Sequence, residues 1–183
     1  CLGVPGLHNV LNSLAAAASA HWCGANAEQI TDGLESFTGA GRRFEFLGTF
    51  AGITVADDYA HHPTEIAATL STAKGMGYQC VWAIFQPFTF SRTARHLDGF
   101  VESLSSADRV ILSDIMGSRE DNKWGVSSEQ ITERIPGALY LPTFEEIAVF
   151  VVENASEGDL VLTMGGGDIY KCARMIAKTL QNG

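Results

Sequence analysis

One stretch organises the predicted fold: Val55-Ala56-Asp57-Asp58-Tyr59-Ala60-His61-His62-Pro63. The apolar residues before Asp57 are typical of a buried strand, whereas Pro63 begins a segment with helical spacing of apolar side chains. We therefore expect residues 57–62 at the carboxyl end of a strand. Ligands bind outside this edge in open α/β sheets, so acids and imidazoles at this position indicate a binding site.

Plainer explanations of this stretch remain open. The two acids could simply cap the segment that follows, and paired histidines also occur on ordinary surfaces. A metal site is disfavoured, because adjacent residues of an extended chain point to opposite sides and His61 and His62 would not share one ion. We expect no metal ligands in this chain.

Composition narrows the class of protein. The 183 residues, 46% of them hydrophobic, suffice for one sizeable core or one core with a small appendage. A formal net charge of −9 argues against binding to nucleic acid, whose phosphates require clustered cations. No apolar run approaches the roughly 20 residues that span a bilayer, and the first residues lack a signal-peptide pattern. We expect a cytoplasmic protein without nucleic-acid or membrane partners.

The cysteines are scattered and show no CxxC spacing. They are Cys1, Cys23, Cys80 and Cys172. The last three have apolar neighbours in sequence, so we predict reduced core thiols, not disulfides or a zinc site.

Residues 5–18 predict an alanine-rich helix. Its expected buried stripe consists of Val10, Leu11, Leu14 and Ala18. His8, Asn9 and Asn12 gather at its start, where free backbone NH groups and the positive dipole end favour polar ligands. Asn9 and Asn12 share a face, so their amides could read one planar heterocycle. An ordinary helix cap would explain one asparagine but not both.

A second helix is expected after Asn26, with Gln29 at the spacing of a capping box. The glycine-bearing joint at residues 38–41 is the predicted boundary between a helical appendage, residues 1–40, and a main domain, residues 41–183.

Beyond this joint, residues 42–47 and 53–55 predict a β-hairpin, and strands then alternate with helices. Further strands are expected at 80–85, 109–112, 138–141 and 159–163. Helices are expected at 65–74, 92–105, 128–134, 144–154 and 168–180. Two more capping boxes are expected, Ser127 with Gln130 and Thr143 with Glu146. This alternation predicts the α/β class, with a mostly parallel, twisted sheet covered by helices on both faces.

Other polar groups follow these strands. Gln86 and Arg92 come after strand 80–85, and a long polar loop at 114–124 follows strand 109–112. Three glycines, 165–167, follow the last strand. They could indicate a dinucleotide site, but that fingerprint needs a further strand and an acid about 20 residues on, so a tight strand-to-helix turn is favoured. The chain has no GxSxG, HExxH or GxxxxGK[ST] motif.

Several of these stretches together resemble a known family. They are residues 4–12 (VPGLHNVLN), 42–44 (RRF), 57–65 (DDYAHHPTE), 85–87 (FQP), 92–93 (RT), 119–120 (RE) and 158–168 (GDLVLTMGGGD). They look like the Mur ligases, with DDYAHHPTE more specific than HNxxN. The resemblance implies a three-layer, Rossmann-like carboxyl-terminal domain at 41–183, preceded at 1–40 by the last helices of a central ATPase domain.

The function implied by the resemblance is ATP-dependent joining of L-alanine to UDP-N-acetylmuramate through an acyl phosphate, a step of peptidoglycan synthesis. Asn9 and Asn12 would contact adenine, Arg43 the phosphates and Asp58 the ribose. The arginine and aspartate suit these roles, because guanidinium groups pair with phosphate and carboxylates accept from hydroxyls.

By the same resemblance, His61, His62 and Arg92 would hold L-alanine, with Arg92 on its carboxylate. Further candidates are His8, Tyr59, Gln86 and Arg119. Mg²⁺ would be bound mainly by the missing central domain. The partners implied are the small-molecule substrates and the missing amino-terminal and central domains, and the chain alone is expected to be inactive.

One departure from the family pattern stands beside this resemblance: Phe88 occupies the place after Gln-Pro where the family usually has histidine, which leaves the amino-acid specificity open. A sister ligase that adds another residue or a peptide is the nearest alternative. A stand-alone α/β nucleotide-binding module is the alternative from another class. Residues 114–124 have no assigned role, since Arg119 and Glu120 could line the site or pair with one another.

Overall fold

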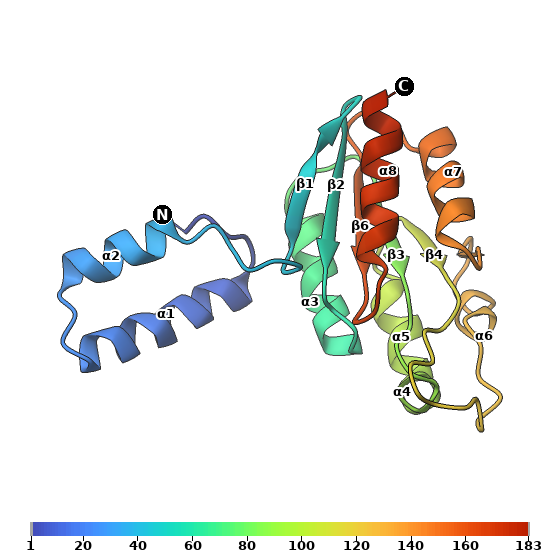
Figure 1. Ribbon diagram of the computed structural model, residues 1–183, viewed down its shortest axis with the longest axis horizontal. Coiled ribbons are helices and arrows are strands. Elements are labelled where there is room, and N and C mark those ends of the chain that lie inside the picture. The colour runs from blue at the N-terminus through green and yellow to red at the C-terminus, as the bar shows by residue number, and fades with distance from the viewer. Residues whose placement is uncertain (1, 183) are drawn as a thin grey trace. The chain divides into compact units, whose positions relative to one another are not determined.

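The computed structural model describes residues 2–182. The chain folds into two compact units, Cys1–Gly41 and Arg42–Gly183. The first unit contains the helices α1 (Leu7–Trp22) and α2 (Ala27–Ser36) (Figure 1).

Within the first unit, the capping box of α2 is confirmed. Asn26 accepts a hydrogen bond from the Gln29 backbone NH at 2.9 Å, and the Gln29 side chain accepts from the Asn26 backbone NH at 3.0 Å. The predicted buried stripe of α1 is wrong, since Leu11 and Leu14 are 60% and 62% exposed and neither helix has a buried residue. Two helices alone cannot enclose an apolar stripe.

The second unit alternates strands and helices. Its strands are β1 (Glu45–Phe50), β2 (Ile53–Asp58), β3 (Val81–Phe85), β4 (Arg109–Leu112), β5 (Leu139–Tyr140) and β6 (Leu160–Met164). Its helices are α3 (Pro63–Lys74), α4 (Phe90–Arg95), α5 (Leu97–Leu104), α6 (Glu129–Thr132), α7 (Phe144–Asn154) and α8 (Tyr170–Asn182).

The strands form one six-stranded sheet in the order β1-β2-β6-β3-β4-β5. β1 is antiparallel to β2 and all other neighbours are parallel, so the predicted α/β class is confirmed. The hairpin turn is Ala51-Gly52, with φ of 49° and 79°, as in the type I′ turns that suit the twist of paired strands. β1 begins three residues later than predicted, because Arg42 and Phe44 have positive φ, which strands do not accommodate.

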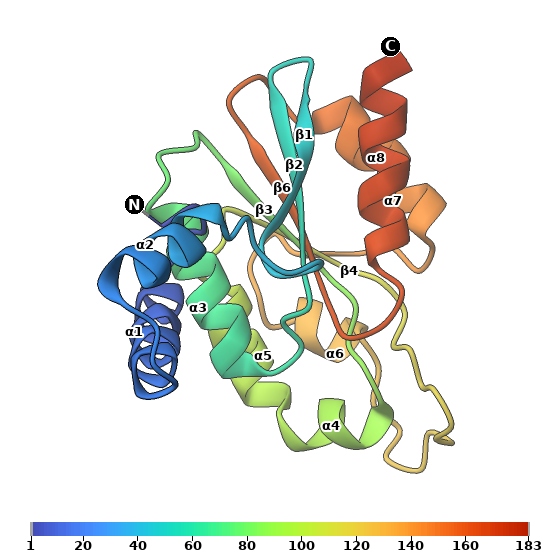
Figure 2. The ribbon, with the colours of Figure 1, turned by 60° about the vertical axis from the view of Figure 1, so that its left-hand side comes forward.

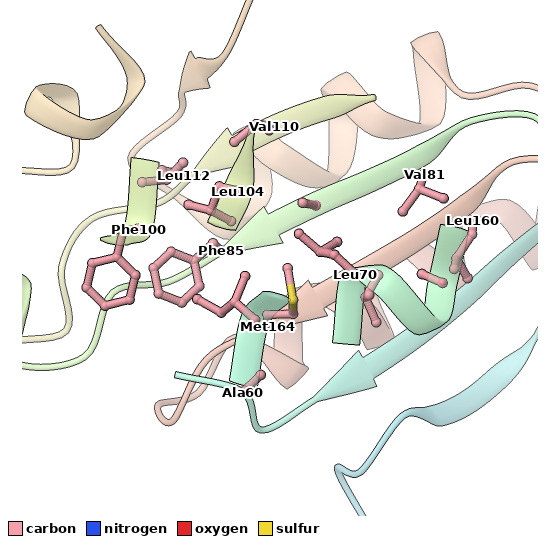
Figure 3. Packing of buried hydrophobic residues seen from close by; sticks show 14 of the residues in the cluster. Ala60, Leu70, Val81, Phe85, Phe100, Leu104, Val110, Leu112, Leu160 and Met164 are labelled. Atoms are coloured by element: carbon pink, nitrogen blue, oxygen red, sulfur yellow. The ribbon is translucent and has the colours of Figure 1, made fainter. Parts of the chain in front are cut away.

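Helices cover both faces of this sheet. Side chains alternate along each strand: Ala83 and Phe85 of β3 pack with α3, α5 and α6, whereas Trp82 and Ile84 pack with α7 and α8. Figure 2 shows α3 and α5 on one side of the sheet and α7 and α8 on the other. Figure 3 shows the first cluster, in which Phe85 and Phe100 face each other. The two cores produce the predicted three layers.

Two helix predictions need correction. The expected helix 92–105 is broken at His96, whose φ of −116° and ψ of 21° separate α4 from α5. The box expected at Ser127 and Gln130 is absent, because the N-cap of α6 is Ser128, whose hydroxyl donates to the Ser113 carbonyl at 2.6 Å. At α7, Thr143 does cap the helix by accepting from the Glu146 NH.

The thiol prediction is correct for one cysteine of the described residues. Cys172 is buried, and burial raises its pKa to about 12. Cys80 is half-buried and Cys23 is exposed, so neither is a core thiol, and Cys1 lies outside the described residues. Apolar neighbours in sequence do not ensure burial when the helix that carries them lacks a partner. Within residues 2–182, no helix is long and apolar enough to cross a membrane.

Candidate functional site

The candidate site lies where three neighbouring strands end. β6 runs between β2 and β3, and Met164 at its end is in register with both Asp58 and Phe85. The carboxyl ends of parallel strands share one edge of a sheet. The loops after β2, β6 and β3 therefore begin side by side (Figure 1).

Arg42 joins the first two of these loops. Its Nε donates to Asp57 at 2.8 Å, its Nη1 to the Gly167 carbonyl at 2.9 Å and its Nη2 to the Gly165 carbonyl at 2.8 Å. Gly165 has a φ of 154°, and a Cβ there would lie 2.8 Å from the Gln86 carbonyl, so glycine is required. The predicted tight turn after β6 is thus held by Arg42, to which sequence analysis assigned no role.

The two acids of the opening stretch are buried, with Asp57 2% and Asp58 6% exposed. Asp57 also accepts from the Thr163 hydroxyl at 2.6 Å. Asp58 accepts from the backbone NH groups of Phe44 and Ala60, both at 2.7 Å. Burial raises the pKa of both carboxyls although these hydrogen bonds oppose the shift. Both acids hold the loops in place, and contact of Asp58 with a ribose stays a prediction.

His62, not an acid, caps α3. Its Nδ1 accepts from the Thr64 NH at 3.4 Å and lies 2.8 Å from the Thr64 hydroxyl. Glu65 completes the capping box by accepting from the backbone NH groups of His61 and His62 at 3.0 and 3.2 Å. Burial raises the pKa of Glu65, but these hydrogen bonds and the neighbouring cations outweigh it and lower the pKa. The alternative that the aspartates cap the next segment is therefore wrong.

The loop after β3 contains polar atoms without partners. Gln86 Oε1 and Arg92 Nη1 are both buried and have no hydrogen-bond partner in the described residues. The Arg92 guanidinium carbon lies 5.9 Å from the centre of the Phe88 ring. Leaving such a group unpaired costs about 1–3 kcal/mol. Native proteins usually leave buried groups unpaired only where a ligand, water or function explains them.

His96 was missed by sequence analysis, and it lies against the predicted site. Its ring centre is 4.6 Å from that of His62. Burial, and then the charges of His62, Arg95 and Arg92, lower the pKa of His96. Four basic side chains thus gather here. No motif marks His96, because the contact depends on how α5 packs against α3.

Arg43 and Arg119 are exposed. Arg43 lies over Tyr59 at 5.5 Å, and Tyr59 contacts the His61 ring at 5.2 Å. Neither arginine forms a hydrogen bond or ion pair with another described residue. Glu120 is bonded to Ser91, so the suggested Arg119–Glu120 pair is absent.

In the first unit, α1 starts from Gly6 without a side-chain cap. Asn9 is therefore not an ordinary cap, and its Nδ2 donates to the Pro5 carbonyl at 2.7 Å. His8 and Asn12 are exposed. No hydrogen bond within residues 2–182 engages the Asn9 oxygen or the Asn12 amide, and their contact with adenine stays a prediction.

The family model described as Mur ligase, glutamate ligase domain matches residues 42–167. The chain belongs to the Mur ligase family. Among curated Mur ligases, UDP-N-acetylmuramate–L-alanine ligase of Lachnospira eligens is 48% identical over 97% of this chain, and that of Acetivibrio thermocellus is 45% identical over 98%. In both cases the match spans 39% of the relative's length.

Solved Mur ligase structures agree with this assignment. UDP-N-acetylmuramate–alanine ligase of Thermotoga maritima matches 99% of this chain and 39% of its own, with a TM-score of 0.83 and 30% identity. A murein peptide ligase of Psychrobacter arcticus matches 97% of this chain and 38% of its own, with a TM-score of 0.72 and 30% identity. The predicted family and fold are confirmed.

Among the described residues, no group of three or more histidine, cysteine or acidic side chains is arranged to hold a metal ion.

Proposed function

We propose that this chain is the carboxyl-terminal part of an ATP-dependent ligase that joins L-alanine to UDP-N-acetylmuramate. The observation that carries the proposal is the 48% identity, over 97% of the chain, to a ligase named for that reaction. At this level of identity both fold and binding residues are usually retained. The chain spans 39% of that relative's length, so the complete enzyme would include further domains.

The first unit would be the end of the central ATPase domain. The exposed apolar face of α1 supports this assignment, because Leu7, Leu11 and Leu14 are each at least 60% exposed. Contiguous apolar side chains on a helix normally face a partner. Asn9 and Asn12 would then contact adenine, with His8 beside them.

The loop after β3 would receive the amino acid. Arg92 carries a charged donor without an acceptor and Gln86 an acceptor without a donor, which complements the carboxylate and the amine of L-alanine. His61 and His62, which directly precede α3, would complete the group of side chains that contact the amino acid. Phe88 packs beside Arg92 and would form an apolar wall next to a small side chain.

Arg43 would meet the phosphates of ATP. It fits this task because it is exposed and forms no ion pair with a described acid, whereas Arg42 is fully occupied. ATP, when bound, would supply the phosphoryl group that activates the muramate carboxylate. Mg²⁺ would be held mainly by the central ATPase domain outside this chain.

The direct test is ADP release by the complete ligase containing this chain, with UDP-N-acetylmuramate as acceptor and L-alanine, glycine, L-serine or a tripeptide as donor. We expect L-alanine to give the highest kcat/KM. In the same assay, R92K should raise KM for L-alanine by about tenfold, because lysine replaces a bidentate guanidinium with a single point charge. A KM for L-alanine in R92K equal to that of wild type would contradict the role of Arg92.

A murein peptide ligase is the second candidate, favoured by the 0.72 TM-score and 30% identity to the Psychrobacter arcticus enzyme. The tripeptide arm of the assay distinguishes the two. Higher kcat/KM with tripeptide than with L-alanine would establish this second function in place of the first.

The 183-residue chain alone should be inactive, because part of the nucleotide site would be missing. We expect L-alanine to bind it no more tightly than about 1 mM, near 4 kcal/mol. A dissociation constant for L-alanine below about 1 mM, measured by calorimetry, would show that the amino-acid site is complete within this chain.

A further inference from the structure

The loop after β4 docks onto the loop after β3. The Met116 NH donates to the Pro87 carbonyl and the Thr89 NH to the Met116 carbonyl, both at 2.9 Å. A Cβ on Gly117 would clash with the Phe90 ring unless that ring moved. The segment 114–120 is therefore fixed against the start of α4.

Glu120 joins this docked loop to α4 through both of its carboxylate oxygens. Its Oε2 accepts from the Ser91 backbone NH at 2.8 Å, and its Oε1 accepts from the Ser91 hydroxyl at 2.6 Å. These hydrogen bonds, with Ser91 the leading cause, lower the pKa of Glu120, so it is ionised at neutral pH. A charge-assisted pair of this kind fixes both partners in direction as well as distance.

Strained backbone surrounds this contact. Thr89 and Ser118 have φ of 65° and 59°, a left-handed conformation that is unfavourable for residues other than glycine. Thr89 stands immediately before α4, and Ser118 lies two residues before Glu120. Such strain persists only where the surrounding contacts enforce it, and the Glu120–Ser91 contact joins these two places.

Arg92 directly follows Ser91, yet it forms no ion pair with Glu120 among the described residues. Both Glu120 oxygens are bonded to Ser91, while Arg92 Nη1 is buried without an acceptor. A carboxylate paired with Arg92 would neutralise it and compete with an anionic ligand. Here Glu120 instead holds the backbone of Ser91, and among the described residues Arg92 Nη1 keeps no acceptor.

We propose that Glu120 is a positioning residue for Arg92, which it orients through Ser91 for the carboxylate of the incoming amino acid. This proposal rests on the proposed function, which assigns that carboxylate to Arg92. It also gives the loop at 114–124 a role: residues 116–120 fix the receiving end of α4. Glu120 need not touch a substrate.

The test compares E120A, E120Q and S91A in the complete ligase, with KM determined separately for the amino acid and for ATP. We expect E120A to raise KM for the amino acid about tenfold and to leave KM for ATP unchanged. E120Q should have an intermediate KM, because its amide oxygen still accepts from the Ser91 NH. S91A should resemble E120Q, since it removes one of the two hydrogen bonds.

D121N is the matched control. Asp121 is the exposed neighbour of Glu120, and its side chain has no hydrogen bond or ion pair with another described residue, so this variant removes the same charge without the contact. Its KM for the amino acid should equal that of wild type. An equal rise of KM in D121N and E120A would assign the effect to net charge and overturn the proposal.

A second measurement does not depend on catalysis. In the 183-residue chain, ¹⁵N relaxation of the Arg92 side-chain Nε should show a lower order parameter in E120A than in wild type, and no change in D121N. An unchanged Arg92 order parameter in folded E120A would overturn the positioning role. If wild-type ligase does not use L-alanine, the proposed function fails, but this relaxation result still decides whether Glu120 orders Arg92.

Discussion

Two loop regions at one edge of the sheet differ in how they satisfy their polar groups. The first, which we call the closed side, consists of Arg42, the end of β2 (57–58) and the turn after β6 (165–169). There Arg42, Asp57 and Asp58 use their hydrogen-bonding groups on protein partners. The second, the open side, is the loop after β3 with the start of α4 (86–92), where Gln86 Oε1 and Arg92 Nη1 have no partner among the described residues.

The difference separates residues that stabilise the fold from residues that are left to bind a ligand. Unpaired buried groups lower stability, and proteins keep them where a ligand supplies the missing partner. Substitutions on the closed side should therefore cost stability, whereas those on the open side should cost ligand binding.

The largest expected effect is that of R42A. This change removes three hydrogen bonds and leaves buried Asp57 without its cation, so we expect the free energy of unfolding to fall by about 3 kcal/mol. Urea denaturation measures it. R43A is the control, since Arg43 is exposed and forms no hydrogen bond or ion pair with another described residue; it should change stability by less than about 0.5 kcal/mol. Equal losses in both variants would remove the distinction between the two arginines.

A smaller loss is expected for D58N. One amide NH₂ would replace an oxygen that accepts from a backbone NH, either that of Phe44 or that of Ala60. Placing two donors against each other leaves one buried group unpaired, at a cost of about 2 kcal/mol. Thermal and urea unfolding should agree on this value. D121N, on an exposed acid whose side chain has no hydrogen bond or ion pair with another described residue, is the control, and a D58N protein as stable as D121N would contradict a framework role for Asp58.

R92M should be close to neutral for stability. Methionine fills similar space and removes a buried donor that has no acceptor among the described residues, so we expect the free energy of unfolding to change by less than about 1 kcal/mol, in either direction. In the complete ligase, the same variant should lose ADP release that depends on the amino acid. A stability loss as large as that of R42A would show that Arg92 is a structural residue after all.

The smallest effect is a pH dependence at His96. Burial and the neighbouring bases His62, Arg95 and Arg92 lower its pKa below the ordinary 6.5. The unfolded chain therefore takes up this proton first, and the stability contributed by neutral His96 is lost as pH falls from 6.5 through the lowered pKa. H96N should weaken the decline in unfolding free energy between about pH 7 and pH 5, the range in which histidine titrates. An identical decline in both proteins would exclude His96 as its source.

The sheet was predictable because each of its strands is a short apolar run followed by turn residues and a helix with regular apolar spacing. The position of Asp58 to His62 at the strand end follows from the same pattern. The exposure of α1 was not predictable. An apolar stripe indicates that a helix has a partner, but not whether the described chain contains that partner.

The closed side shows a second limit of sequence patterns. Arg42 bonds with Gly167, which lies 125 positions away, and no local pattern distinguishes Arg42 from Arg43. The break at His96 likewise depends on packing between helices. Contacts of this kind arise only once the sheet has formed, so the roles of Arg42, His96 and Glu120 required the structure.

The cap that His62 provides for α3 has a consequence for proton placement. Because Nδ1 accepts from the Thr64 NH, the neutral ring must carry its hydrogen on Nε2. The helix start thus selects one tautomer before any ligand arrives. The neutral imidazole can therefore donate from Nε2 to an anion without first gaining a proton.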